Sequence, residues 1–119
     1  YPEGSRAGQP DPEVVKLVEE TSAELGIERR EIDDDEVLKR CLYGLINEGA
    51  RILEDGIAIR PCDIDIVYIN GYGFPEVVGG PMFWAQTIGL DTVVAGLEQH
   101  GLPVSNYLRA RAEDSGKFA

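Results

Sequence analysis

The 119-residue sequence has few of the residues on which the chemistry of a protein site most often depends. It contains one histidine, one tryptophan and two cysteines. No apolar run approaches the roughly 20 residues that a membrane-spanning helix needs, and the first residues show no signal-peptide pattern. Cys41 and Cys62 lack the spacing of a metal site, and a disulfide framework is not expected. These absences favour a reduced, intracellular compartment.

Positive charge is scarce as well. Eleven lysines and arginines stand against 22 aspartates and glutamates, which gives a net charge of −11, and 12 of the acidic residues lie between Glu3 and Glu36. Such acidity argues against nucleic acids and anionic membranes as partners, because both would repel it. It also argues against this chain alone gripping a polyphosphate.

Methionine is missing from the start of the chain, which opens with Tyr1 and has its single methionine at Met82. A translated protein begins with methionine unless it is processed, so we expect this chain to be a domain excised from a longer protein. Its length suits one domain with a sizeable core. We place a linker at residues 1–9 and the domain at residues 10–119.

Strands are not expected, because the spacing of apolar residues predicts about six helices in an all-α domain. The first predicted helix runs from an Asp11 cap and Pro12 to Gly26. The segment 63–69 alternates like a strand, but the sequence offers no partner strand and a lone strand is unstable. We therefore predict a short helix there that ends near Asn70. Three more helices are predicted over residues 81–89, 91–101 and 105–116, the last two capped by Asp91 and Ser105.

The longest predicted helix begins with Asp33 as its N-cap and with Glu36 completing an acidic capping box, and it ends at Gly56. Gly49 lies on its apolar face and permits close approach of another helix. Partner packing or the core of the domain would use this face. The face is expected to comprise Leu38, Cys41, Leu42, Leu45, Ile46, Ile52 and Leu53.

The densest run of glycine, proline and aromatic residues is Gly71-Tyr72-Gly73-Phe74-Pro75, followed by Gly79-Gly80-Pro81-Met82-Phe83-Trp84. Glycines permit positive φ and prolines fix φ, so the path of this loop is dictated. We expect the aromatic side chains to anchor it to a core or an interface, with an acyl-chain pocket as the alternative. These side chains are Tyr72, Phe74, Phe83 and Trp84.

No pattern in the sequence assembles a metal or cofactor site. The acidic run 33–36 is a candidate cation site, but acidic residues in the first turn of a helix complement its dipole. Asp63 and Asp65 resemble the start of a calcium loop whose later ligand and glycine are missing. Gly71-x-Gly73 lacks the third glycine of a dinucleotide loop, because Glu76 stands in its place. We predict no metal ligand and no cofactor-binding residue.

The remaining candidate catalytic residues are also expected to have structural roles. His100 precedes Gly101 at a predicted helix C-terminus, where a histidine suits the dipole, and no nucleophile stands near it in sequence. Cys41 lies among apolar residues and is expected in the core, while Cys62 lies near a helix start. We predict no catalytic residue in this chain.

Several motifs follow one another over roughly residues 10–118. In this order they resemble the C-terminal domain of 3-hydroxyacyl-CoA dehydrogenases, and most of all the last domain of multifunctional fatty-acid β-oxidation enzymes, which also carry an enoyl-CoA hydratase/isomerase. The motifs are Asn47-Glu48 at the head of residues 47–58, Asp63-Ile64-Asp65, Gly71-Tyr72-Gly73-Phe74-Pro75, Gly79-Gly80-Pro81-Met82-Phe83-Trp84-Ala85 and Gly89-Leu90-Asp91.

The resemblance implies an all-α domain that follows an NAD-binding Rossmann domain, which in the family holds the catalytic histidine and glutamate. Multifunctional chains contain the helical unit twice. The first copy contacts substrate through an Asn of an Asn-Arg pair, and the second packs against the first like a dimer partner. Lys39-Arg40 stands at the place of that pair here, and Glu76-Val77-Val78 alters the loop. Both departures imply the second, structural copy.

The resemblance further implies a parent that oxidises L-3-hydroxyacyl-CoA with NAD, while this domain alone binds no cofactor and is inactive. The expected partners are the preceding helical copy and the Rossmann domain of the same chain. Self-association is expected after excision, through an apolar patch. A bacterial cytoplasm is the expected location, or a peroxisome if the source is eukaryotic. Two alternatives remain: a free-standing helical module that binds a protein or an acyl chain, and a metal-dependent enzyme that uses the acidic run.

Overall fold

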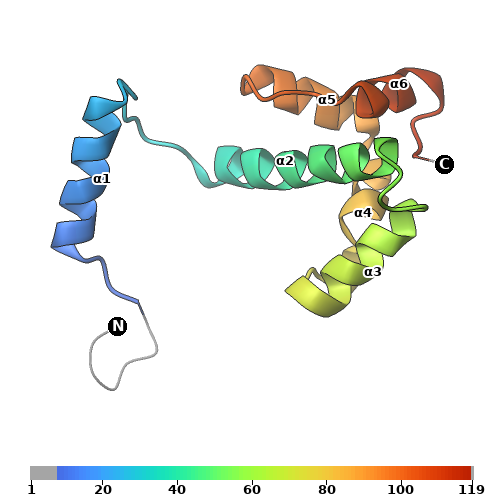
Figure 1. Ribbon diagram of the computed structural model, residues 1–119, viewed down its shortest axis with the longest axis horizontal. Coiled ribbons are helices and arrows are strands. Elements are labelled where there is room, and N and C mark those ends of the chain that lie inside the picture. The colour runs from blue at the N-terminus through green and yellow to red at the C-terminus, as the bar shows by residue number, and fades with distance from the viewer. Residues whose placement is uncertain (1–7, 119) are drawn as a thin grey trace. The chain divides into compact units, whose positions relative to one another are not determined.

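The computed structural model describes residues 8–118, which contain six α-helices, one short 3₁₀ helix and no strand (Figure 1). The prediction of an all-α chain with about six helices is confirmed. The chain divides into two compact units, one up to Ile32 and one from Asp33, so the extent of the domain at residues 10–119 stays a prediction. Most of the predicted linker lies outside the described residues. The helices are α1 (Pro12–Glu24), α2 (Asp34–Glu54), α3 (Pro61–Tyr72), η1 (Glu76–Val78), α4 (Pro81–Ile88), α5 (Leu90–Gln99) and α6 (Asn106–Asp114).

The N-terminal unit contains α1, which begins and ends as predicted. Asp11 accepts the backbone N–H of Glu13 at 2.9 Å, Pro12 is the first helical residue, and Gly26 takes a φ of 64° just beyond the end. None of the residues of α1 is buried, and its valines and Leu17 are largely exposed. Residues 8–32 of the unit therefore include a helix with an apolar stripe but form no buried core.

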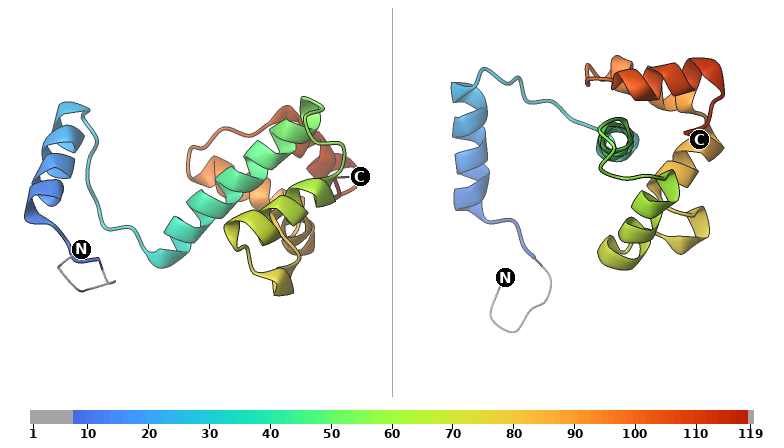
Figure 2. Two further views of the ribbon diagram at one scale, coloured as in Figure 1. Left: turned by 60° about the horizontal axis from the view of Figure 1, so that its bottom comes forward. Right: turned by 45° about the vertical axis from the view of Figure 1, so that its right-hand side comes forward.

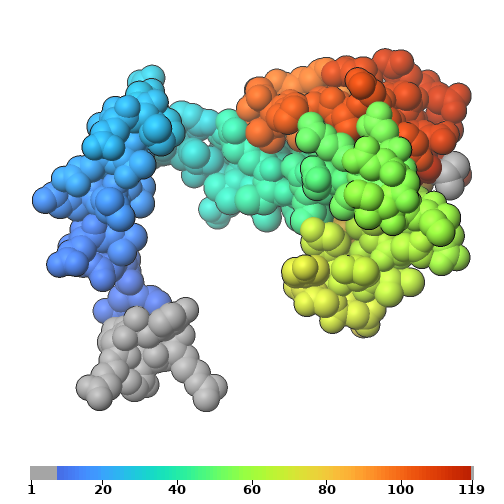
Figure 3. Space-filling model, in the orientation of Figure 1, coloured from blue at the N-terminus to red at the C-terminus, as the bar shows by residue number. Residues whose placement is uncertain are grey.

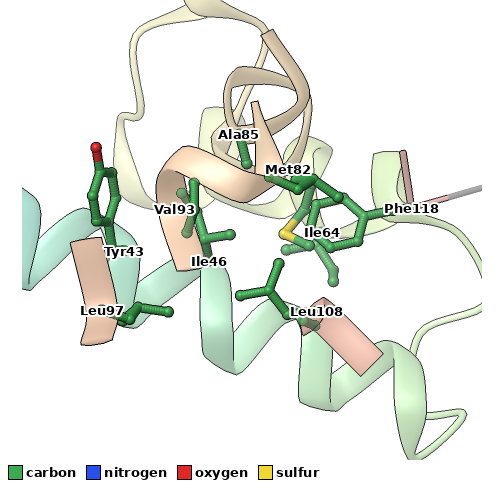
Figure 4. Close-up of a cluster of buried hydrophobic side chains, with 11 residues drawn as sticks. Tyr43, Ile46, Ile64, Met82, Ala85, Val93, Leu97, Leu108 and Phe118 are labelled. Atoms are coloured by element: carbon green, nitrogen blue, oxygen red, sulfur yellow. The ribbon is translucent and has the colours of Figure 1, made fainter. Parts of the chain in front are cut away.

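The helical unit is organised around α2. The pair α5 and α6 packs along one side of this helix, and α4 packs against it from another side with α3 alongside (Figure 1 and the right-hand view of Figure 2). Side chains from every α-helix of the unit, together with Phe118, meet in one core (Figure 4). The core residues are Tyr43, Ile46, Ala50, Ile64, Met82, Ala85, Leu90, Val93, Leu97, Leu108 and Phe118.

The buried face of α2 is displaced from the predicted one. Tyr43, Ile46, Asn47 and Ala50 are buried with the i, i+3, i+4, i+7 spacing of a single face, and Gly49, which was predicted on the apolar face, is buried beside them. Leu42, Ile52 and Leu53 lie at the edge of the core, but Leu38 is 57% exposed and the Cys41 thiol is on the surface. The prediction that Cys41 lies in the core was wrong. Apolar residues cover two sides of α2, and only the positions of the other helices decide which side is internal.

Two helix boundaries differ from the prediction. α3 continues two residues beyond Asn70, since Gly71 and Tyr72 complete its last turn. Gly73 then adopts φ 71°, and the N–H of Phe74 bonds the carbonyl of Tyr68 at 3.0 Å, which is a Schellman-type end. The N-cap of α5 is Gly89 rather than Asp91, which lies one residue inside the first turn. Leu90, the first residue of the helix, is fully buried.

The helical glycines give a matched test of packing. A Cβ added at Gly96 would overlap the ring of Tyr43, whereas a Cβ at Gly44 meets nothing within 4 Å. We expect Gly44→Ala to raise the free energy of unfolding by about 0.5–1 kcal/mol, because alanine favours a helix over glycine. Gly96→Ala is expected to lower it by about 1–3 kcal/mol through overpacking. Urea unfolding followed by circular dichroism measures both, and changes of the same sign would contradict the packing.

Candidate functional site

The motif residues gather at two points where a buried polar side chain on one helix holds the start of another helix. We call them the α4 clamp, formed by Asp65 with the start of α4, and the α6 clamp, formed by Asn47 with Ser105. Neither polar group had a predicted role of this kind.

The α4 clamp supplies a helix cap that α4 itself lacks, because the helix begins with Gly80-Pro81 and no side-chain cap of its own. Asp65, only 6% exposed, reaches over from α3. Its Oδ1 accepts the N–H of Met82 at 2.7 Å and its Oδ2 accepts the N–H of Phe83 at 3.2 Å. A carboxylate at this end of a helix also complements the helix dipole.

Gly80 is required by the same clamp. Its φ is 91°, a conformation that side-chain-bearing residues rarely adopt, and an added Cβ would lie 2.5 Å from the Cβ and Oδ1 of Asp65. Pro81 then occupies the first position of α4 and is itself buried. The Gly79-Gly80-Pro81 motif therefore brings the start of α4 against Asp65.

Two opposing influences act on the Asp65 carboxyl. Burial disfavours its charged form, while the two backbone N–H groups favour it. Burial is the larger influence, and the pKa of Asp65 is raised above the usual 3.8.

Asp63, two residues earlier, also holds the start of a helix, but it does so at the surface and on its own helix, α3. Its Oδ2 accepts the backbone N–H of Arg60 at 3.1 Å and its Oδ1 accepts from the Arg60 guanidinium at 2.7 Å, which closes the N-terminus of α3. The hydrogen bond from Arg60 holds the pKa of Asp63 below its usual range. The Asp63-Ile64-Asp65 motif thus anchors the starts of two helices, one on the surface and one in the interior.

The α6 clamp joins residues far apart in sequence. Asn47, 5% exposed, accepts the backbone N–H of Ser105 through Oδ1 at 2.7 Å. Ser105 Oγ in turn accepts the N–H of Leu108 at 3.0 Å, which confirms Ser105 as the cap of α6. The neighbouring Glu48 is exposed and lies 3.9 Å from Arg51. Only the asparagine of the Asn47-Glu48 motif has an internal task in this domain.

The aromatic residues of the loop do not act together as predicted. Tyr72 and Phe83 are mostly exposed, so these two do not anchor the loop to the core, and their part in an interface stays a prediction. Phe74 meets the ring of Tyr68 edge-on at 6.4 Å, and Trp84 lies 6.4 Å from the ring of Tyr43. The loop holds its path through backbone geometry instead, since Pro75 precedes η1 and Gly79 ends it with φ 76°.

His100 has a carboxylate neighbour that the sequence spacing did not reveal. Its Nδ1 lies 3.7 Å from Glu36 Oε1, which also accepts a bond from Arg40 Nε at 2.7 Å. A histidine oriented by a carboxylate is the base of many hydrolytic sites, but there the outer nitrogen meets the substrate. Here Nε2 is buried and has no hydrogen-bond partner within the described residues. The pair joins the start of α2 to the end of α5 and offers no accessible base.

Residues of the acidic run at the start of α2 contact that helix itself and, through Glu36, His100. Asp33 accepts the N–H of Glu36 at 2.7 Å, as predicted for the N-cap, and Asp35 lies 2.6 Å from Lys39 Nζ. Within residues 8–118 no group of three or more histidine, cysteine, aspartate or glutamate side chains is arranged to hold a metal ion. In the same range no helix is long and apolar enough to cross a bilayer.

Gly71-x-Gly73 does not fit an NAD phosphate. These glycines lie at the C-terminal end of α3, where carbonyl groups point outward and the helix dipole is negative. A dinucleotide phosphate needs the opposite end of a helix.

The surface of the helical unit has two larger hollows. One, of about 340 Å³, is lined by Lys39, Tyr43 and residues of α5. The other, of about 440 Å³, lies between the C-terminal end of α2, the α2–α3 connection and α3, and we call it the isoleucine groove. Figure 3 shows the α2–α3 connection at the surface of the unit. The groove is lined by Ile52, Ile57, Ala58, Ile59, Asp63, Ile64, Val67 and Tyr68.

Comparison with known proteins gives a consistent result. A family model described as 3-hydroxyacyl-CoA dehydrogenase, C-terminal domain, matches residues 37–119. The chain is 48% identical over 102 residues to the peroxisomal bifunctional enzyme of Danio rerio and 50% identical over 95 residues to that of Homo sapiens. These matches cover 84% and 80% of this chain but only 14% and 13% of the relatives. The peroxisomal fatty acid beta-oxidation multifunctional protein AIM1 of Arabidopsis thaliana is 34% identical, over 94% of this chain and 17% of its own length.

Proposed function

The chain belongs to the 3-hydroxyacyl-CoA dehydrogenase C-terminal domain family, and from that premise we propose that it is the last, bracing domain of a bifunctional fatty-acid β-oxidation enzyme. The parent would oxidise L-3-hydroxyacyl-CoA to 3-ketoacyl-CoA with NAD and would also hydrate enoyl-CoA. NAD and the reacting groups belong to other domains of the parent. This domain packs against the preceding helical copy and supports the dehydrogenase half.

The observation that supports this proposal most strongly is that the polar motif residues stabilise the helices of this domain. Asp65 and Asn47 both point inward and hold helix starts, and neither is presented to a ligand. The only histidine, His100, is half-buried beside Glu36, and its Nε2 atom is buried. A domain whose distinctive polar residues all stabilise its own helices is suited to a structural task.

Lys39 supports the assignment to the second helical copy. It stands where the resemblance places a substrate-positioning asparagine in the first copy. The Lys39 ammonium lies 2.6 Å from Asp35, one turn earlier on α2, and this contact raises the pKa of Lys39. Its charge is thus paired within the helix. We assign Lys39 no part in substrate binding.

The partners and the location follow from the same family. The matched residues span only about 14% of the length of the Danio rerio relative, which supports the preceding helical copy and the Rossmann domain as partners in one chain. The names of the relatives support a peroxisome if the source is eukaryotic. The bacterial cytoplasm and the self-association of the excised domain stay predictions, and sedimentation of the 119-residue chain at high concentration tests the latter.

The proposed function predicts that the 119-residue chain forms no NADH from 3-hydroxybutyryl-CoA and NAD. The longer gene product should form NADH, and the same product shortened to end before Asp33 should lose dehydrogenase activity several-fold, because a marginal loss of stability lowers the active fraction. NADH absorbance measures all three. Turnover by the chain alone would overturn the structural role. An undiminished activity of the shortened product would overturn the bracing role.

A further inference from the structure

We propose that the isoleucine groove is the surface on which another domain of the same parent chain docks. The inference deepens the proposed function and rests on it, because that function supplies the parent. It assigns the docking to one surface of the helical unit and to an occupant of stated chemistry: an apolar helix or loop tethered to this domain.

The composition of α3 is the first reason. Ile64 and Val67, one turn apart, share the side of α3 that lines the groove, and the helical spacing places Ile66 on another side. A helix with large apolar residues on more than one side is typically buried on more than one side. In the helical unit only Ile64 and Asp65 of α3 are buried, while Ile66 and Val67 are 56% and 55% exposed. The apolar composition of α3 is typical of a buried helix, but in this unit much of its apolar surface is exposed.

The α2–α3 connection is the second reason. Ile57 and Ile59 are 75% and 89% exposed, although both are large and branched. Both line the groove together with Val67. A single exposed apolar residue needs no explanation, but several that converge on one hollow mark a contact surface.

The scarcity of charged residues in the groove favours an apolar occupant. In a protein with a net charge of −11, Asp63 is the only charged residue that lines it, and Asp63 is bonded to Arg60. A free fatty acid would need a cation for its carboxylate. The neighbouring cation, Arg60, already has its guanidinium on Asp63 at 2.7 Å. The apolar side chains of a protein segment fit the groove better than a charged amphiphile.

The small size of the groove favours an occupant that is joined to this domain by the chain over a separate protein. Eight residues line it, whereas separate proteins that bind stably bring about 20–30 residues each to an interface. A second copy of this chain would therefore bind weakly through the groove alone. A domain joined to this one by the chain has an effective concentration on the order of 1 mM, which makes a weak apolar contact sufficient.

Thiol labelling tests the proposal. Val67→Cys places a reporter in the groove, and Val77→Cys is the matched control, because Val77 is 92% exposed and lies outside the groove. Each variant is made in the 119-residue chain and in the longer gene product, and labelling by iodoacetamide is followed peptide by peptide by mass spectrometry. With the tethered domain docked, we expect Val67→Cys to react about tenfold more slowly in the longer product. Val77→Cys should react equally in both.

Equal rates for Val67→Cys in the two proteins would overturn the proposal. So would protection that appears in the 119-residue chain as its concentration rises, which indicates a second copy, or only with added palmitate, which indicates an acyl chain. The dehydrogenase assay of the shortened product is read separately. If Val67→Cys is unprotected while shortening still abolishes activity, the bracing role stands and the groove assignment falls. If Val67→Cys is protected in the longer product while shortening leaves the activity unchanged, the bracing role is rejected and the groove assignment stands.

Discussion

Replacing Asp65 with alanine is expected to lower the free energy of unfolding by about 3 kcal/mol. The substitution removes the acceptor for two backbone N–H groups at the start of α4, those of Met82 and Phe83. An N-cap is worth about 1–2 kcal/mol, and a buried donor left without an acceptor costs a further 1–3 kcal/mol. Urea unfolding at neutral pH measures the loss. Asp55→Asn, at the exposed C-terminal end of α2, is the control and should change stability little.

The Asp65→Asn variant separates charge from hydrogen bonding. Because the pKa of Asp65 in the folded state is raised above 3.8, the folded protein binds this proton more readily than the unfolded chain does. The contribution of Asp65 to stability is therefore largest in acid and falls as the pH rises through the folded pKa. The free energy of unfolding of the wild type minus that of Asp65→Asn should therefore increase when the pH is lowered from about 7 to about 4.5. A difference that shrinks on acidification would mean that the N–H groups outweigh burial.

Replacing Asn47 with alanine is expected to lower the free energy of unfolding by about 2–3 kcal/mol. The N–H of Ser105 would lose its acceptor in a buried position, and a small cavity would form beside it. The effect should be concentrated at α6, so amide hydrogen exchange at Ser105 and Leu108 should accelerate more than exchange in α3.

Glu48→Ala is the matched control for Asn47→Ala, since it changes the next residue of the same helix and motif. Glu48 is exposed, and within the described residues it makes one ion pair, in which its Oε2 lies 3.9 Å from the Arg51 guanidinium. Such pairs contribute little, so we expect less than about 0.5 kcal/mol. If both variants lose equal stability, the α6 clamp is not the reason that Asn47 matters to this domain.

The helix caps show where sequence reasoning succeeded. Asp11, Asp33 and Ser105 were identified correctly, because each accepts a backbone N–H two or three residues ahead and the whole interaction is visible in a short window. The clamps of Asp65 and Asn47 reach 17 and 58 residues along the chain. No local pattern reveals such a distance.

One signal for the α4 clamp was nevertheless present in the sequence. The predicted helix at Pro81 follows two glycines and has no residue that can cap it. Its orphan N–H groups therefore needed an acceptor from elsewhere, and a carboxylate such as Asp65 on an otherwise apolar helix was the natural candidate. The exposure of Leu38 and Cys41 had no such signal. The apolar positions of α2 form a stripe wider than one neighbour can cover, and only the assembled fold shows which part remains outside.

The direction of the two clamps has a consequence for how such a domain can change over time. Both are formed by inward-facing side chains and backbone N–H groups, so the scaffold is held together independently of what the outer surface displays. Lys39 takes part in neither clamp and is paired with Asp35 on its own helix. A substitution at such a position therefore leaves both clamps and the helix arrangement that they hold in place.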